Sequence, residues 1–150
     1  MTPGEIMKLN EQVIEAWNRH DDKSFLAVCD EKIVWSINYE QEKFSGTEEV
    51  KNYFNTWQEA FPDLLIQVRT RVLSIDKITV EYVFTGTHKG NLRLSSELPE
   101  ISATGKKVMF SGCYIARFKN FLVTEVSNYP DRLALIGQLG VIPELQQQIV

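Results

Sequence analysis

Three polar side chains interrupt apolar strand faces in the second half of the chain, and together they could act on a carbonyl compound. His88 follows one alternating apolar face, while Tyr114 and Asn128 fall among apolar neighbours on two others. An imidazole has an unperturbed pKa near neutrality, and a phenol or an amide can donate a hydrogen bond to an oxygen. Buried polar groups need partners, which a ligand can supply. We therefore predict a small-molecule site around these three residues.

Each of these residues also has a structural interpretation, and the sequence leaves both interpretations open. An isolated histidine such as His88 near a strand end is more often a surface or a satisfied core residue. Tyr114 fits a core aromatic whose hydroxyl reaches solvent. Asn128 fits a residue that shapes the turn before the next helix. Asp131 has the position of a helix N-cap, and Glu125 lies on the opposite strand face from Asn128.

Several common site chemistries lack their motifs in this sequence. There is no P-loop, no Gly-x-Gly-x-x-Gly and no Gly-x-Ser-x-Gly, which removes the commonest nucleotide-binding and serine-hydrolase interpretations. The chain has two histidines and neither Cys-x-x-Cys nor His-Glu-x-x-His, so we expect no metal site. Cys29 and Cys113 are too few for a disulfide framework and are expected to be reduced thiols.

The composition is that of one acidic, aromatic-rich domain covering residues 1–150. The 150 residues are 43% hydrophobic and carry a formal charge of −4, so no basic field favours nucleic acid. No apolar run approaches the ~20 residues that a membrane helix needs. The N-terminal sequence lacks the basic stretch and apolar run of a signal peptide. We therefore expect a cytoplasmic protein that binds neither nucleic acid nor membrane.

The first half of the chain is predicted to be mainly helical. Thr2, Pro3 and Glu5 form a capping box with proline in the first turn, ahead of an apolar stripe that begins at Ile6 and ends at Trp17. Further along, the patterns predict a short helix after Asp21, a strand over 33–37, a polar loop from Glu40 to Gly46, and a third helix that Ser45–Glu48 opens and Phe61–Pro62 ends.

The second half has the two-residue period of strands. We predict strands over 64–74, 78–88, 107–118 and 121–129, a polar loop from Lys89 to Lys106, and a short helix after Pro130–Asp131. In the last strand, Leu122, Thr124, Val126 and Asn128 are assigned to one face. Helices followed by antiparallel strands predict an α+β fold, with the helices packed on one face of a curved sheet.

Several short motifs resemble the SnoaL-like polyketide cyclases. They are Gly86-Thr87-His88-Lys89-Gly90, Ala103-Thr104-Gly105-Lys106-Lys107, Pro62-Asp63-Leu64, the break Asn18-Arg19-His20-Asp21-Asp22, and the ending Pro130-Asp131 with Gln138-Leu139-Gly140. Their order and spacing extend the resemblance over roughly residues 5 to 140. It implies a nuclear-transport-factor-2-like cone, in which a strongly curved antiparallel sheet wraps around the N-terminal helices and leaves an internal pocket.

The resemblance also implies cofactor-free chemistry, an intramolecular aldol closure in which an Asp moves the proton and a His assists at the enolate. In this chain Asn128 stands at the position of that Asp, and Tyr114 stands at that of the His. Because an amide cannot deprotonate a carbon acid, the fold and the pocket carry over better than the reaction. His88 matches the Gly-x-His-x-Gly segment of the family. The residues expected to contact substrate are Trp35, Trp57, Tyr82 and Phe110.

Three functions from different classes remain open at this stage. The first is a cofactor-independent cyclase-, isomerase- or lyase-type enzyme acting on a small apolar carbonyl compound, with His88 or an unplaced carboxylate moving the proton. The second is a non-catalytic module that binds a small hydrophobic molecule in the same cavity. A purely structural dimer is a third. On the opposite strand faces Val72, Val83, Cys113 and Ile115 are apolar, which predicts a homodimer through the sheet.

Overall fold

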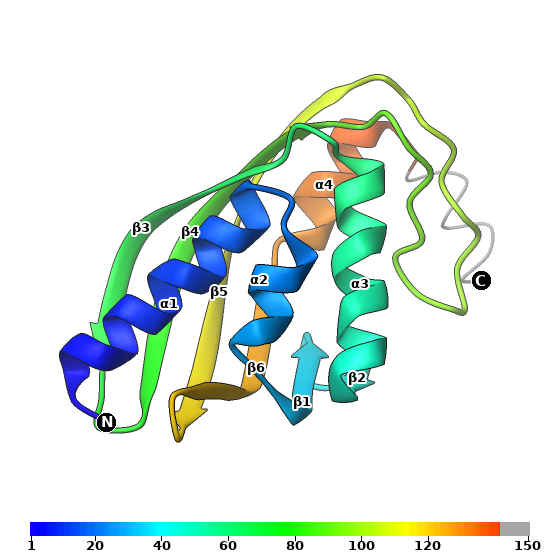
Figure 1. The fold of residues 1–150 in the computed structure, drawn as a ribbon. Coiled ribbons are helices and arrows are strands. Elements are labelled where there is room, and N and C mark those ends of the chain that lie inside the picture. Colours follow the sequence, from blue (N-terminus) through cyan, green and yellow to red (C-terminus); the bar gives the residue numbers. More distant parts are fainter. Residues whose placement is uncertain (142–150) are drawn as a thin grey trace.

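The computed structural model describes residues 1–141, which form a six-stranded sheet with helices packed against one face. The elements are α1 (Pro3–Asn18), α2 (Asp22–Ala27), β1 (Cys29–Ile37), β2 (Glu42–Ser45), α3 (Gly46–Ala60), β3 (Leu65–Leu73), β4 (Lys77–Thr87), β5 (Lys107–Lys119), β6 (Leu122–Pro130) and α4 (Arg132–Leu139). Figure 1 shows α1, α2 and α3 on the same side of the sheet. The predicted α+β class is confirmed.

The first helix begins and packs as its sequence predicts. The Thr2 hydroxyl accepts a hydrogen bond from the Glu5 amide at 3.1 Å, and the Glu5 carboxylate accepts one from the Thr2 amide at 2.7 Å. This capping box satisfies two of the free N–H groups at the start of α1. The stripe from Ile6 to Trp17 is buried against the sheet, which fixes the helix over β3 and β4.

The strand order places the first strand, β1, beside the last strand, β6. The strands lie in the order β2-β1-β6-β5-β4-β3, and all neighbours are antiparallel except β1 and β6. The parallel pair corrects the prediction of an entirely antiparallel sheet. In it, Trp35 lies opposite Val126 and Ile37 lies opposite Asn128. The long pair β4–β5 is in continuous register from Lys77 to Thr87.

One local prediction for the segment before α3 is wrong, and one is confirmed. The predicted polar loop from Glu40 to Gly46 contains the short strand β2, whose four residues are too few to show a clear two-residue period. Ser45 is the N-cap residue of α3, as predicted, but its hydroxyl makes no capping hydrogen bond. Instead, the Glu49 carboxylate accepts a hydrogen bond from the Ser45 amide at 3.1 Å.

The face prediction for β6 fails at a bulge. The β5–β6 register shifts between Arg117 and Phe118, so that Phe118 pairs with Val123 rather than with Thr124. An extra residue in one strand moves the following side chains to the other face. Val123, Val126 and Asn128 are therefore buried, whereas Leu122 and Thr124 are half-exposed.

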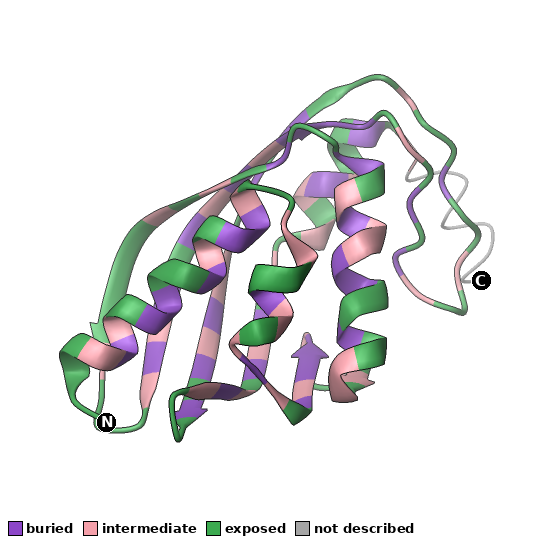
Figure 2. Cartoon of the chain, in the orientation of Figure 1, coloured by how far each residue is buried: buried purple, intermediate pink, exposed green. Residues whose placement is uncertain are grey.

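The core lies between the helices and the inner face of the sheet, where buried residues line α1 and α3 (Figure 2). On β5 the inward set Val108, Phe110, Tyr114, Ala116 and Phe118 is buried, as its alternation predicts. Within residues 1–141, no helix has the length and apolar character needed to cross a membrane.

Candidate functional site

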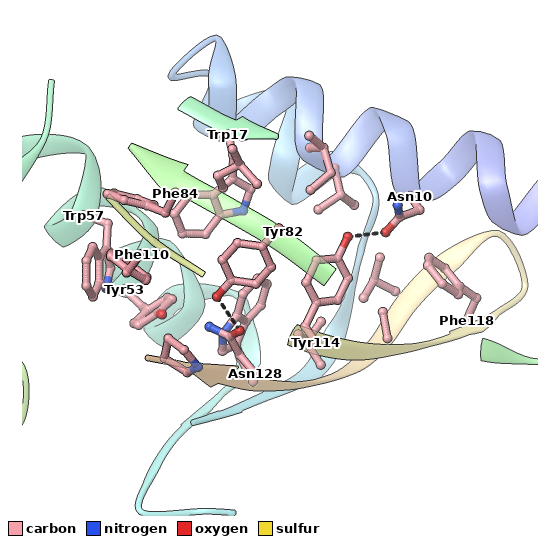
Figure 3. A pocket seen from close by; sticks show the side chains of 18 residues that line it. Asn10, Trp17, Tyr53, Trp57, Tyr82, Phe84, Phe110, Tyr114, Phe118 and Asn128 are labelled. Carbon is pink, nitrogen blue, oxygen red and sulfur yellow. Dashed lines mark hydrogen bonds between the residues drawn. The ribbon is translucent and has the colours of Figure 1, made fainter. Parts of the chain in front are cut away.

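An apolar cavity of about 70 Å³ lies between the helices and the inner face of the sheet. This is several times the roughly 10–15 Å³ that one water molecule needs. Aromatic side chains such as Trp17, Trp57, Phe84 and Phe110 form much of its wall (Figure 3). Enclosed apolar walls with a few polar groups are typical of small-molecule sites.

At one end of the cavity, an amide is held in a fixed orientation by a buried phenol. The Tyr82 hydroxyl donates a hydrogen bond to Asn128 Oδ1 at 2.8 Å (Figure 3). Burial raises the pKa of Tyr82, so the hydroxyl keeps its proton. With Oδ1 engaged, Asn128 presents its Nδ2 group as a donor, and the residue is only 8% exposed.

Tyr82 reaches Asn128 because the neighbouring strand has no side chain at the critical position. Gly112 pairs with Tyr82 in the β4–β5 register. A Cβ atom on Gly112 would lie 2.4 Å from the Tyr82 hydroxyl oxygen, closer than real side chains approach. Gly112 therefore provides the space through which the phenol crosses β5 toward β6.

A second polar pair lies farther along the cavity, between α1 and β5. The Tyr114 hydroxyl donates to Asn10 Oδ1 at 2.5 Å, and both side chains are buried (Figure 3). Burial raises the pKa of Tyr114, so its hydroxyl keeps its proton and donates it to Asn10. Because this proton is engaged, Tyr114 offers the cavity the lone pairs of its oxygen.

Two further polar groups surround Asn128. Tyr53 projects from α3, and its hydroxyl lies near both Asn128 and Trp35; burial raises the pKa of Tyr53 to about 12. Trp35 lines the cavity from β1. Its Nε1–H group is buried and has no hydrogen-bond partner among the described residues. The β6 end of the cavity thus gathers an amide, two phenols and an indole N–H.

His88 lies outside the lining of this cavity, so the structure does not bring it together with Tyr114 and Asn128. It is fully buried, and its Nδ1 accepts a hydrogen bond from the Thr104 amide at 3.1 Å. Its backbone bonds to Lys106 and Gly105. Burial lowers the pKa of His88 below its ordinary value of 6.5. These hydrogen bonds hold the two ends of the loop between β4 and β5 together, so the contacts of His88 stabilise the loop.

Arg132 and Glu42 form an ion pair next to the cavity residues Tyr53 and Trp57. Arg132 Nη1 lies 3.4 Å from Glu42 Oε1, and the two side chains are 16% and 19% exposed. The Arg132 guanidinium also lies 5.5 Å from the ring centre of Trp57. Burial raises the pKa of Glu42, and the positive charge of Arg132 opposes the rise. Glu42, Tyr53 and Trp57 line a second hollow of about 550 Å³, which shares the last two residues with the cavity.

The four residues expected to contact substrate, Trp35, Trp57, Tyr82 and Phe110, all line the cavity. Sequence reasoning missed Asn10 and Glu42. Asn10 follows Ile6 by four residues and precedes Val13 by three, so its place on the buried stripe of α1 was a readable signal. Glu42 carried no such signal, because β2 was not predicted.

Two other expectations concern Asp131 and the metal ligands. The Asp131 carboxylate accepts a hydrogen bond from the Ala134 amide at 3.0 Å and so caps α4. In the part of the chain that the structure describes, no three His, Cys, Asp or Glu side chains come together as metal ligands would.

Solved structures share this fold across nearly their whole length. A candidate SnoaL-like polyketide cyclase from Jannaschia sp. CCS1 superposes with a TM-score of 0.82 at 15% identity, covering 95% of this chain and 98% of its own. TsrD from Streptomyces laurentii gives 0.80 at 21% identity, covering 95% and 99%. AclR from Streptomyces galilaeus, a candidate hydroxylase, gives 0.78 at 22% identity, covering 95% and 100%. At these identities the likeness concerns the fold.

The sequence itself decides the family. No curated protein matches the chain. The family profile of the SnoaL-like polyketide cyclases matches residues 7–139, which include every element from α1 to α4 that contributes to the cavity. The chain therefore belongs to the SnoaL-like polyketide cyclase family.

Proposed function

We propose that this protein is a cofactor-independent cyclase-, isomerase- or lyase-type enzyme that binds a small apolar carbonyl compound in its internal cavity. The observation that carries the proposal is the Asn128 amide, buried among apolar side chains and oriented by Tyr82. A fixed N–H donor in a dry cavity stabilises negative charge that develops on an oxygen. The proposed substrate oxygen accordingly accepts from Asn128.

The reaction requires removal of a proton from the carbon beside the carbonyl. The electrons of that C–H bond move into the carbonyl and form an enolate, whose carbon then attacks a second carbonyl or is reprotonated elsewhere. Asn128 and Tyr114 cannot be the base, since an amide does not accept the proton and the phenol remains protonated. Asn128 positions and stabilises the substrate oxygen through its N–H group, whereas the Tyr114 proton is already donated to Asn10.

We propose Glu42 as the group that moves this proton. Glu42 lies opposite Ile37, which in turn lies opposite Asn128, so the three residues form one row across β2, β1 and β6. Its carboxyl is half-buried in the second hollow, which shares Tyr53 and Trp57 with the cavity, so a substrate that extends between the two hollows brings its carbon toward Glu42. A base with a pKa raised toward neutrality suits a carbon acid better than an exposed carboxylate does.

The test for Asn128 needs no knowledge of the natural substrate. In D2O, the protein is expected to accelerate hydrogen–deuterium exchange beside the carbonyl of small ketones such as 1-tetralone and 4-phenyl-2-butanone, followed by NMR. Asn128→Leu keeps a similar volume and removes the donor, so exchange should fall by about 10²-fold. Gly4→Ala serves as a control, since a Cβ there comes no closer than 3.9 Å to another residue. Unchanged exchange in Asn128→Leu contradicts the assignment.

The test for Glu42 is the pH profile of the same exchange. Because only the carboxylate accepts a proton, the rate should rise with pH through the pKa of Glu42, which lies above its ordinary value of 4.5. Glu42→Gln should remove this rise. Arg132→Gln should move it to higher pH, since Arg132 lowers that pKa. Glu97→Gln, in the same hollow, is the control; a profile unchanged in Glu42→Gln rejects the role.

A non-catalytic binding module is the second candidate function. Among the described residues, the tyrosines are the only ionisable side chains that line the cavity, which favours binding without turnover. In that case, calorimetry should show that the ketones bind while the exchange rate equals that of buffer. Exchange that then begins in Asn128→Asp would indicate a cavity derived from an enzyme.

We also propose that two copies pair through the outer face of the sheet, where Val83, Cys113 and Ile115 are half-buried and Val72 is 63% exposed. Light scattering should give about twice the chain mass of 17.3 kDa. Ile115→Glu should give the mass of one chain, whereas Phe121→Glu, at the exposed β5–β6 turn, should not. A single-chain mass for the unaltered protein contradicts this proposal. A cytoplasmic location stays a prediction.

A further inference from the structure

The β6 end of the cavity contains an indole N–H donor that makes no hydrogen bond of ordinary geometry with the described residues. Trp35 is 7% exposed, and its Nε1–H has no partner among residues 1–141. A buried donor without an acceptor costs free energy, and an indole N–H can only donate. Buried polar groups of this kind usually find a partner, so the position of Trp35 in the cavity wall points to an acceptor brought by a ligand.

This indole donor lies next to Asn128. Trp35 pairs with Val126 and Ile37 pairs with Asn128 on neighbouring parallel strands, so Trp35 and Asn128 sit diagonally on the same inward face. The distance between such diagonal neighbours is about 7–8 Å, which one acceptor atom placed between a long indole and an amide can bridge. The Tyr53 hydroxyl oxygen, on α3, lies near both donors without completing a hydrogen bond to Trp35. A substrate oxygen in this position replaces the phenol as their acceptor.

We infer that Trp35 is a second donor to the substrate oxygen, so that one carbonyl oxygen receives hydrogen bonds from Trp35 Nε1 and Asn128 Nδ2. The inference rests on the proposed function and narrows its substrate class. The oxygen must be an acceptor that needs no proton of its own, as in a ketone or an ester. A hydroxyl group would bring a further donor into a site that already has two.

The walls define the rest of the substrate. Phe84 and Phe110 are stacked with ring centres 4.7 Å apart, and the ring of Trp57 lies edge-on to Phe84 at 5.7 Å. Flat aromatic faces around a narrow cavity complement a flat skeleton rather than a bulky or charged one. The substrate class that fits is a carbonyl group attached to a planar apolar ring system.

The experiment compares two probes that differ only in the oxygen. 1-Tetralone is a flat bicyclic ketone, and tetralin is the same skeleton without the carbonyl. In calorimetry the unaltered protein should bind 1-tetralone at least tenfold more tightly than tetralin, which corresponds to about 1.4 kcal/mol. Trp35→Phe should reduce this preference to twofold or less while tetralin binding stays within threefold. Gly4→Ala, at the start of α1 and outside the cavity, is the control and should leave the preference intact.

A direct readout is the Trp35 indole N–H resonance in a ¹⁵N-labelled sample, identified by its disappearance in Trp35→Phe. It should move downfield with 1-tetralone and stay in place with tetralin. A ketone preference that survives Trp35→Phe, or an indole resonance that ignores the ketone, overturns the role of Trp35 and leaves the proposed function standing. If the unaltered protein binds neither probe, the proposed function fails, and the inference fails with it.

Discussion

The Gly112→Ala variant is expected to lose about 10²-fold in ketone exchange, as much as removal of the Asn128 donor itself. The added methyl would lie 2.4 Å from the Tyr82 oxygen and 2.5 Å from its Cζ atom, so the phenol has to move. Asn128 Oδ1 then loses its partner, and nothing keeps Nδ2 directed into the cavity. Forcing extra volume into a packed core costs about 1–3 kcal/mol, which should lower Tm by roughly 3–10 °C.

A double variant separates the steric effect from the loss of the hydrogen bond. Tyr82→Leu removes the ring edge that the new methyl would strike, so Gly112→Ala should cost much less stability in that background. The coupling between the two changes is expected to be about 1–3 kcal/mol. Exchange activity should stay low in all three variants because each lacks the bond between Tyr82 and Asn128. Independent, additive stability effects would show that Gly112 does not make room for Tyr82.

The Gly90→Ala variant is expected to show the largest loss of stability, roughly 3 kcal/mol or more. Here the new methyl would lie 2.2 Å from the Glu59 carbonyl oxygen and 2.9 Å from its carbon, which are backbone atoms at the end of α3. The amides of Lys89 and Gly90 both donate to the Ala60 carbonyl, so the two segments are held together at this contact. Backbone atoms at the end of a helix cannot relieve the clash by changing rotamer, as a side chain can, so the two segments have to move apart.

Urea unfolding measures the change in the free energy of unfolding for Gly90→Ala. Hydrogen exchange of the Thr104 amide should accelerate as well, because its bond to His88 depends on the same loop. Gly4→Ala adds the same methyl in open space near the start of α1 and should change stability by less than about 0.5 kcal/mol. A Gly90→Ala protein as stable as that control would contradict the close approach.

The sequence predicts elements well where a local rule dominates. The capping box at Thr2 and Glu5 is a short-range pattern, and it forms as expected. The inward face of β5 follows from strict alternation, which continuous pairing with β4 preserves. The resemblance to a family was also correct, because it rests on the order of several motifs along the chain.

The errors arise where tertiary pairing overrides the local pattern. The β6 bulge near Thr124 depends on how β5 pairs, so alternation within β6 alone placed Leu122 on the wrong face. Two-residue alternation along β4 also assigned His88 to the apolar face of that strand. The strand ends at Thr87, however, and the His88 side chain bonds to Thr104 in the following loop. Whether the Trp35 N–H has a hydrogen-bond partner depends on all the residues that pack around it. No local sequence pattern can therefore predict that it lacks one.

The parallel pairing of β1 with β6 also sets when the site can exist during synthesis. Trp35 is made early, but its neighbours across the strand, Val126 and Asn128, belong to the last strand of the sheet. Tyr114 likewise reaches Asn10 across 104 residues of chain. Contacts between residues so distant in sequence form late and slow folding. The chain loses the entropy of loop closure before these contacts stabilise it. On the ribosome, therefore, the cavity is completed only after β6 has emerged, although α1 and α3 pack mainly on strands made before it.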